Sequence, residues 1–280
     1  MGVPAKIDFG WIKQAWTLFS AQSGVWVGAL LLSFLIYLSV WLLLAIPTGG
    51  LTQFQRAFSH GLTHSSSQSS YFHPAPTAGV YERLVLRQGR GILLAGLNAI
   101  LTGGLYRMAL QQKRGEAISV FGLFSALPLS LPLFAVGAVV PIILGFVEGA
   151  CLWPLHRFLP RTSVSITGNV YLGLTTLLNS LLMFAPLLVL DAKANAAEAI
   201  VGSVRLLRGQ LLRGIWFYVV ASFVGGVGLI LCGVGMLATY PVFLLSIALA
   251  YLALTQSDAD SPVFDPAPAG VWPPPPRPFS

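Results

Sequence analysis

The sequence predicts an all-α, polytopic membrane protein, and two observations carry that prediction. Only 25 of the 280 residues are charged (16 Lys and Arg, 9 Asp and Glu), which is 9%, against about 25% in soluble domains. Apolar residues make up 55% of the chain, and they cluster in six runs. Each run is long enough for the roughly 20 helical residues that cross about 30 Å of hydrocarbon. The solvent of much of this chain is therefore lipid.

We expect six transmembrane helices at residues 25–46, 91–110, 127–153, 168–190, 211–232 and 236–254. The first apolar run is too long for the core of a cleaved signal peptide, so we expect it to remain as an anchor. The third contains Pro128, Pro132 and Pro141, which predicts a kinked or broken helix. Only residues 233–235 separate the last two, which predicts a tight hairpin.

Residues 1–255 are therefore expected to form one transmembrane domain. Within it, residues 50–88 have the composition of a polar outer loop, rich in Ser and His around residues 59–78. Residues 256–280 are expected to form a Pro-rich tail. The tail ends in Val-Trp-Pro-Pro-Pro-Pro-Arg-Pro-Phe-Ser, a composition typical of a polyproline II helix.

Three stretches that each precede a pair of apolar runs resemble one another, at residues 8–20, 117–125 and 195–210. In the first, Asp8 is placed to cap a helix. In the third, one helical face lies opposite Glu198 and Arg205 and carries Ala197, Ile200, Val204 and Leu207. We expect three amphipathic helices lying in the cytoplasmic interface, and a threefold repeat of interfacial helix plus transmembrane hairpin.

The distribution of basic residues predicts the orientation. With the N-terminus inside, the inner segments hold ten Lys and Arg residues and the outer segments hold six. Because cytoplasmic segments carry an excess of Lys and Arg, both termini are expected in the cytoplasm. The net charge of +7 is then explained by topology signals and lipid headgroups, and we expect no nucleic-acid partner.

The chain lacks the common catalytic and nucleotide-binding motifs, so we expect no enzyme activity and no cofactor. His60 and His64 have the i, i+4 spacing of two metal ligands on a helix. Their neighbours are Ser, Thr and Gly, which favour a solvated loop over a helix. They are therefore weak metal candidates, and we expect no metal site.

Three strongly polar residues fall inside predicted spans: Asn98, Asn179 and Glu148. Ionisable groups at membrane depth are costly and often functional. Glu148 lies only five residues before Trp153, however, so pairing with Arg87 or Arg90 is an alternative to a proton or ion site. Hydrogen bonds between helices are the ordinary role of the two asparagines, and a polar transport path is the alternative.

Two sets of arginines and two aromatic residues are candidates for contacts with lipids or partners. One basic stripe precedes the second predicted span, and another surrounds the start of the fifth. The two aromatic residues lie within the tail, on either side of its proline run. Lipid phosphate is the ordinary partner of such stripes, and an acidic protein surface is the alternative. A preformed polyproline helix loses little entropy on docking. The residues are Arg83, Arg87 and Arg90; Arg205, Arg208 and Arg213; and Trp272 and Phe279.

Several short motifs along the chain resemble those of a known family. They are Ala15-Trp16-x-Leu18-Phe19, Gly103-Gly104-Leu105-Tyr106, Arg114-Gly115-Glu116, Asp191…Glu198-Ala199-Ile200…Ser203…Gly209-Gln210 and Gly233-x-Gly235…Pro241…Tyr251. The family they resemble is an uncharacterised one of six-helix bacterial membrane proteins, distantly similar to the membrane domain attached to some glycerophosphodiester phosphodiesterases. The resemblance covers about residues 7–255 and implies six helices in a bacterial inner membrane; it implies no catalytic residue.

Together these features favour a non-enzymatic integral membrane protein that acts by binding. We expect an accessory or scaffold subunit of a larger bacterial membrane complex, in contact with lipids and partner proteins. The alternative is a small-solute or lipid transporter with a polar path near Asn98, Asn179 and Glu148.

Overall fold

The computed structural model describes residues 7–45, 77–147, 150, 163–228 and 234–259. Its regular elements are all helical, and no strand occurs in these ranges. The elements are α1 (Gly10–Ala21), α2 (Ser23–Ala45), α4 (Thr77–Lys113), the 3₁₀ helix η1 (Val120–Leu129), α5 (Ser130–Val147), α7 (Ser163–Leu181), α8 (Ala185–Asp191), α9 (Ala196–Leu207), α10 (Leu211–Val227) and α11 (Met236–Ala259).

Five described segments are long and apolar enough to cross a membrane, and a sixth is added if α9 and α10 form one broken span. The predicted all-α, multi-pass membrane class is confirmed at this level. The five are Ser23–Leu44, Gln88–Lys113, Val120–Val147, Gly168–Asp191 and Met236–Gln256. The α9–α10 pair is bent by 104° at its break.

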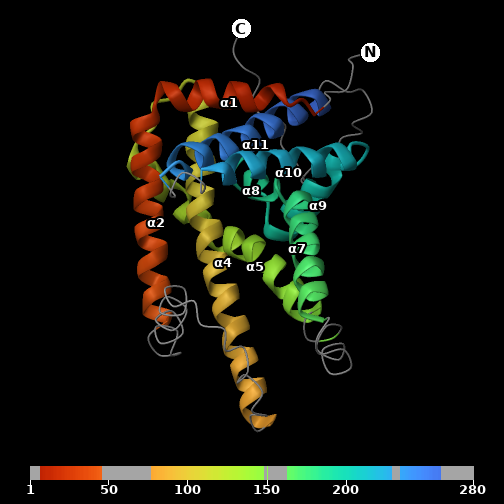
Figure 1. The fold of residues 1–280 in the computed structure, drawn as a ribbon. Coiled ribbons are helices and arrows are strands. Elements are labelled where there is room, and N and C mark those ends of the chain that lie inside the picture. The colour runs from red at the N-terminus through yellow and green to blue at the C-terminus, as the bar shows by residue number, and fades with distance from the viewer. Residues whose placement is uncertain (1–6, 46–76, 148–149, 151–162, 229–233, 260–280) are drawn as a thin grey trace.

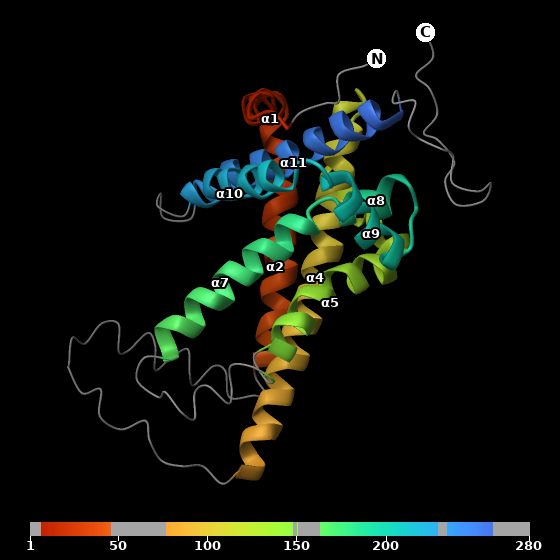
Figure 2. The same ribbon diagram turned by 90° about the vertical axis from the view of Figure 1, so that its right-hand side faces the viewer.

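The long helices are arranged in two directions. Helices α2 and α4 run lengthwise and α7 runs obliquely to them, whereas α1, α10 and α11 lie across α2 and α4 near one end of the molecule (Figures 1 and 2). We call this the α1 end. Helix α11 packs against both α1 and α10 there, and it also contacts α2 and α4. It is therefore the helix around which the α1 end is assembled.

The hydrophobic core gathers around α11, α4 and the short helix α8. Tyr251, Phe184, Leu105, Leu188 and Leu244 are each at most 2% exposed. Residue Pro186 stands at the start of α8, where its missing N–H costs no helical hydrogen bond. Large side chains from three separated parts of the chain thus fill one continuous interior.

Small residues let α4 approach η1 and α5 closely. A Cβ atom added to Gly104 would lie 2.0 Å from the backbone oxygen of Leu123, and one added to Gly137 would lie 2.4 Å from the Cβ of Ala99. In a membrane, helix association depends on this kind of close van der Waals packing, because lipid is as apolar as the side chains. Glycine at these places is required by the backbone separation.

Two of the three amphipathic stretches form α-helices. Before α1, the Asp8 carboxylate accepts a hydrogen bond from the Gly10 N–H (3.0 Å). Helix α9 begins with a capping box: Asn195 Oδ1 accepts from the Glu198 N–H (3.0 Å), and Glu198 Oε2 accepts from the Asn195 N–H (3.1 Å). At the start of each helix, these side chains bond to backbone N–H groups that have no partner within the helix.

The middle stretch differs from the expected α-helix. Its residues enter the 3₁₀ helix η1, which contains Pro128. Proline removes a backbone donor and its ring clashes with the preceding turn of an α-helix, so a tighter helix is formed up to Ser130, where α5 begins. The predicted irregularity of the third span is thus located at its start.

Helix α4 is longer than the apolar run that predicted it. It begins at Thr77, inside the segment expected to be a polar outer loop. Residues 77–90 include Leu84, Leu86 and several residues with long polar side chains, which have good helix propensity. The helix therefore extends well before the apolar stretch that can cross a membrane.

Candidate functional site

A buried glutamine ties α4 to the junction of α1 and α2. Gln112 is 8% exposed. Its Oε1 accepts a hydrogen bond from the indole N–H of Trp26 (2.9 Å), and its Nε2 donates to the backbone oxygen of Leu18 (2.7 Å). Trp26 is itself completely buried. Both ends of the amide thus have partners, as burial of such a group requires.

A second contact joins the ends of α4, α8 and α11. Arg114 forms an ion pair with Asp191 through Nη2 and Oδ1, and the hydroxyl of Tyr251 donates to Asp191 Oδ2 (3.2 Å). One carboxylate therefore holds three helices that are far apart in the sequence.

The segment around α1 is fastened to α10. The Ile7 N–H donates to Gln210 Oε1 (3.0 Å) across 203 residues of sequence. The ring of Phe217 lies 6.1 Å from that of Phe9 and 5.7 Å from that of Trp11, centroid to centroid. Aromatic pairs at these distances add to the stabilisation from burial.

Ser203 of α9 forms hydrogen bonds with backbone groups at the break between α7 and α8. Its hydroxyl donates to the Leu181 oxygen (2.6 Å) and accepts from the Phe184 N–H (3.3 Å). Backbone groups freed at a helix break need such partners in an apolar interior. The polar side chains at Gln112, Asp191 and Ser203 thus hold helices together.

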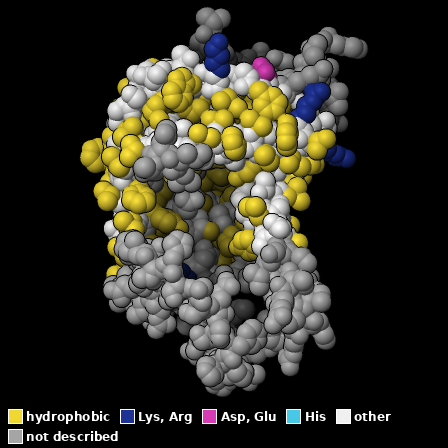
Figure 3. All heavy atoms as spheres, viewed as in Figure 1, with side chains coloured by type: hydrophobic (Ala, Val, Ile, Leu, Met, Phe, Trp, Pro, Cys, Tyr) yellow, Lys and Arg dark blue, Asp and Glu magenta, His cyan; other side chains and the backbone are white. Residues whose placement is uncertain are grey.

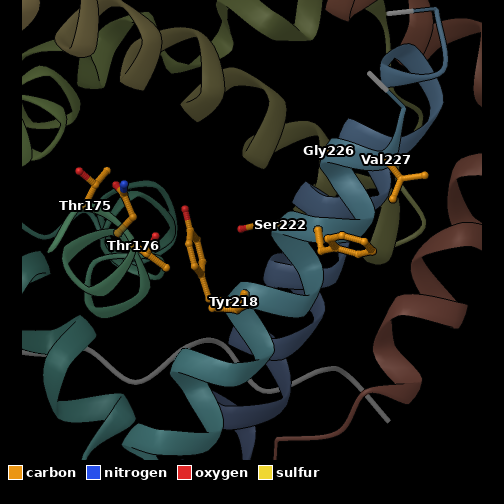
Figure 4. A pocket seen from close by; sticks show the side chains of 9 residues that line it. Thr175, Thr176, Tyr218, Ser222, Gly226 and Val227 are labelled. Atoms are coloured by element: carbon orange, nitrogen blue, oxygen red, sulfur yellow. The ribbon is translucent and has the colours of Figure 1, made fainter. Parts of the chain in front are cut away.

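An open groove of about 550 Å³ lies between α7 and α10. Figure 4 shows Thr175 and Thr176 on the α7 side and Tyr218 and Ser222 on the α10 side. The other lining residues are Asn179, Val219, Phe223, Gly226 and Val227. The groove has a volume in the range of small-molecule sites and combines hydrogen-bonding groups with apolar walls.

The intramembrane polar candidates are not all brought to one place. Asn179 lines the groove, whereas Asn98 is exposed on α4 and is not among the lining residues. Glu148 lies outside the described residues, as do His60, His64, Trp272 and Phe279. The described ranges contain no cluster of three or more His, Cys, Asp or Glu side chains.

The basic candidates occupy two kinds of surroundings. Arg205, Arg208 and Arg213 are exposed around the junction of α9 and α10. The guanidinium of Arg90 lies 5.2 Å from the ring centroid of Trp41, a cation–π distance. The side chains of Arg83 and Arg87 lie outside the part of the chain that the structure describes.

The surface between these charges is apolar. In Figure 3, the charged side chains that can be seen gather mainly near the α1 end, and hydrophobic side chains cover much of the described surface below them. Phe34, Leu43, Leu131, Leu212 and Phe223 are each between 59% and 81% exposed. Exposed apolar area of this extent fits a lipid environment or a partner surface.

Of the nine residues that line the groove, sequence reasoning singled out only Asn179; among those it missed are Tyr218 and Ser222. Their i, i+4 spacing on α10 places both hydroxyl groups on one helical face, and both side chains line the groove. A search for hydroxyl-bearing pairs in apolar helices would have found them. Their position opposite Asn179 has no signal in the local sequence.

No family model, curated protein or solved structure matches this chain.

Proposed function

We propose that this chain is a non-enzymatic, multi-pass membrane protein that binds lipids and partner proteins as an accessory or scaffold subunit of a larger complex. We place it in a bacterial cytoplasmic membrane with both termini inside. The excess of basic residues in the inner segments supports that orientation. The α1 end then faces the cytoplasm.

The observation that carries this proposal is the surface where α9 bends into α10, which we call the elbow. It exposes Arg205, Arg208 and Arg213 beside two large apolar side chains, Leu212 (81% exposed) and Trp216 (61% exposed). Basic groups near aromatic and aliphatic groups are the composition of interfacial lipid anchors. The elbow is thus suited to anionic phospholipid headgroups.

The use of polar groups inside the fold also supports binding over catalysis. Gln112, Asp191 and Ser203 are each engaged with groups on other helices. An active site needs polar groups that are held in place and directed toward a substrate. Here these groups connect helices, and the elbow presents basic and apolar side chains to other molecules.

The elbow is tested by replacing its three arginines together with glutamine (R205Q/R208Q/R213Q). Each arginine near an anionic surface contributes about 1 kcal/mol, so we expect binding of cardiolipin and phosphatidylglycerol to fall by at least about tenfold. Native mass spectrometry of the full chain, released from nanodiscs of stated lipid composition, measures the bound lipid.

The matched control replaces three exposed lysines that carry the same total charge, K13Q/K113Q/K193Q. We expect the control to retain most of the bound anionic lipid. Equal lipid loss in the two triple variants would show that total charge, not the elbow, determines binding. Unchanged binding in the elbow variant would contradict the proposed lipid contact.

The proposed binding of partner proteins has a separate test. Purification of the full chain from its native membrane in mild detergent should recover it with other membrane proteins in fixed proportion. Recovery of the chain alone, as a monomer, would contradict an accessory or scaffold role.

Transport of a small solute or lipid is the second candidate, because Asn179 lines a groove between two helices. This candidate requires polar groups to act along one path. In proteoliposomes, Glu148→Gln and Asn179→Leu should each abolish uptake if such a path exists. The scaffold proposal expects both variants to assemble with partners as the unchanged chain does.

A further inference from the structure

The α7 side of the groove belongs to a segment that can cross a membrane. The apolar span that contains α7 begins at Gly168, and the groove residues from Thr175 to Asn179 follow it by seven to eleven positions. At 1.5 Å per residue they lie about 10–17 Å along the helix from its start. In a chain that spans the membrane, as proposed above, this part of α7 lies among the lipid chains, which occupy roughly 30 Å.

The hydrogen-bonding groups of the groove are only partly used by the protein. The hydroxyls of Thr175 and Thr176 donate to the Tyr171 and Leu172 oxygens of their own helix (2.7 and 2.8 Å), which leaves their lone pairs available. Tyr218 and Ser222 add two more hydroxyl groups from α10. Acceptor capacity therefore remains on the α7 side of the groove.

Asn179 contributes two amide donors and an acceptor oxygen to this groove. Its side chain has no hydrogen-bond partner among the described residues, and it is half-buried in the groove wall. An amide left unbonded in hydrocarbon costs several kcal/mol. A molecule that occupies the groove and bonds to this amide removes that cost.

The lining residues carry no formal charge. Placing an anionic or cationic headgroup among them would leave its charge without a partner at low dielectric, which is strongly unfavourable. An uncharged group with hydroxyl or ester oxygens matches both the amide and the hydroxyls. The apolar side chains of Val219, Phe223 and Val227 provide surface for an acyl chain.

We propose that the α7–α10 groove is a binding site for a neutral, hydroxyl-bearing lipid of the diacylglycerol class. The ester and hydroxyl oxygens of the lipid bond to the amide of Asn179 and the hydroxyls beside it. One acyl chain lies along the apolar face of α10. This site is separate from the elbow, which takes anionic headgroups at the membrane surface.

A photoactivatable diacylglycerol with a diazirine in one acyl chain tests the proposal on the full-length protein in phosphatidylcholine nanodiscs. We expect light-dependent labelling of peptides from α7 and α10, identified by mass spectrometry. The same diazirine carried on phosphatidylglycerol should label these peptides much less. Equal labelling by both probes would overturn the preference for a neutral lipid.

Gly226→Phe is the variant that fills the site. A Cβ atom at Gly226 meets no other atom within 4 Å, so the new ring enters open space and the helix is not forced apart. We expect diacylglycerol labelling of both helices to fall to the level seen without light. Labelling that persists in a variant with unchanged size-exclusion behaviour would overturn the assignment of the site.

Asn179→Leu keeps the approximate size of the side chain and removes the amide. The loss of its hydrogen bonds should weaken diacylglycerol binding about fivefold. The control is Asn169→Leu, an exposed asparagine on the same helix that does not line the groove. Equal affinity in the two variants would show that Asn179 does not bind the lipid.

Failure here is distinguishable from failure of the elbow. The groove variants should retain bound cardiolipin, and the elbow variant R205Q/R208Q/R213Q should keep its diacylglycerol labelling. Loss of both lipids in either variant would show that the two surfaces are one site and would overturn the proposal.

Discussion

Helices α2 and α11 look alike in sequence and occupy opposite environments. Each has an apolar stretch of 21 or 22 residues that can cross a membrane. In an apolar 18-residue window of α2, 6% of the residues are buried inside the protein, against 61% in the corresponding window of α11. Apolar composition therefore identifies helices that belong in a membrane, but it does not distinguish a helix facing lipid from one in the core.

The difference follows from what each helix has to pack against. Helix α11 is enclosed by α1, α10, α4 and α2. Helix α2 is buried mainly near its start, at Trp26, Ala29 and Leu30, and exposes Phe34 and Leu43 farther along. In lipid an exposed apolar residue has little cost, so α2 can leave most of its length outside the core.

The sharpest test replaces one leucine in each helix with alanine. Leu244 of α11 is 0% exposed and Leu43 of α2 is 69% exposed. Leu244→Ala leaves a cavity and should lower the free energy of unfolding by about 2–5 kcal/mol. Leu43→Ala should change it by less than about 0.5 kcal/mol. Titration with sodium dodecyl sulfate in mixed micelles measures both.

Similar losses in the two variants would contradict the assignment of α2 to the lipid-facing surface. That outcome would indicate a partner or a second copy packed on α2 under the conditions of the measurement. Repeating the titration at several protein concentrations separates this case from an error in the fold.

The second test compares a closely packed position with an open one within a single helix, α4. Gly104→Ala places a Cβ atom against the Leu123 backbone, which cannot move aside as a flexible side chain can. We expect a loss of about 1–3 kcal/mol from this overpacking. Gly91→Ala meets no atom within 4 Å and should stabilise α4 by about 0.5–1 kcal/mol through helix propensity. Destabilisation by both would contradict the close contact of α4 and η1.

The third and smallest effect concerns the hydrogen bond that joins Trp26 of α2 to Gln112 of α4. Trp26→Phe removes the donor to Gln112 Oε1 and leaves a buried acceptor unbonded, at a cost of about 1–2 kcal/mol. Because the same bond is lost in Gln112→Leu, the double variant should be less destabilised than the sum of the two single variants. Strict additivity in this cycle would show that the bond does not hold α2.

Local sequence features predicted those parts of the fold that depend on local physics. The apolar runs located the segments that can cross a membrane, and Asp8 marked a helix start that the structure contains. Proline at position 128 predicted an irregular third segment. These signals act within a few residues, so one sequence is enough to read them.

Contacts between distant residues could not be predicted in this way. Asp191 bonds to partners 77 positions before it and 60 positions after it, and nothing near Asp191 in the sequence specifies either one. The course of α10 and α11 across the other helices (Figures 1 and 2) also depends on α1 covering α11. Asn179 was recognisable as a polar residue at depth, whereas its neighbours across the groove come from another helix.

The bond between the Ile7 N–H and Gln210 has a consequence for the order of synthesis. The ribosome adds about 5–20 residues per second, so Gln210 is made some 10–40 seconds after Ile7. During that time α2 has already been made, while the partners of α1 on α10 and α11 do not yet exist. The amphipathic α1, with Trp16 half-exposed, therefore cannot reach its final contacts until both of these helices have been made.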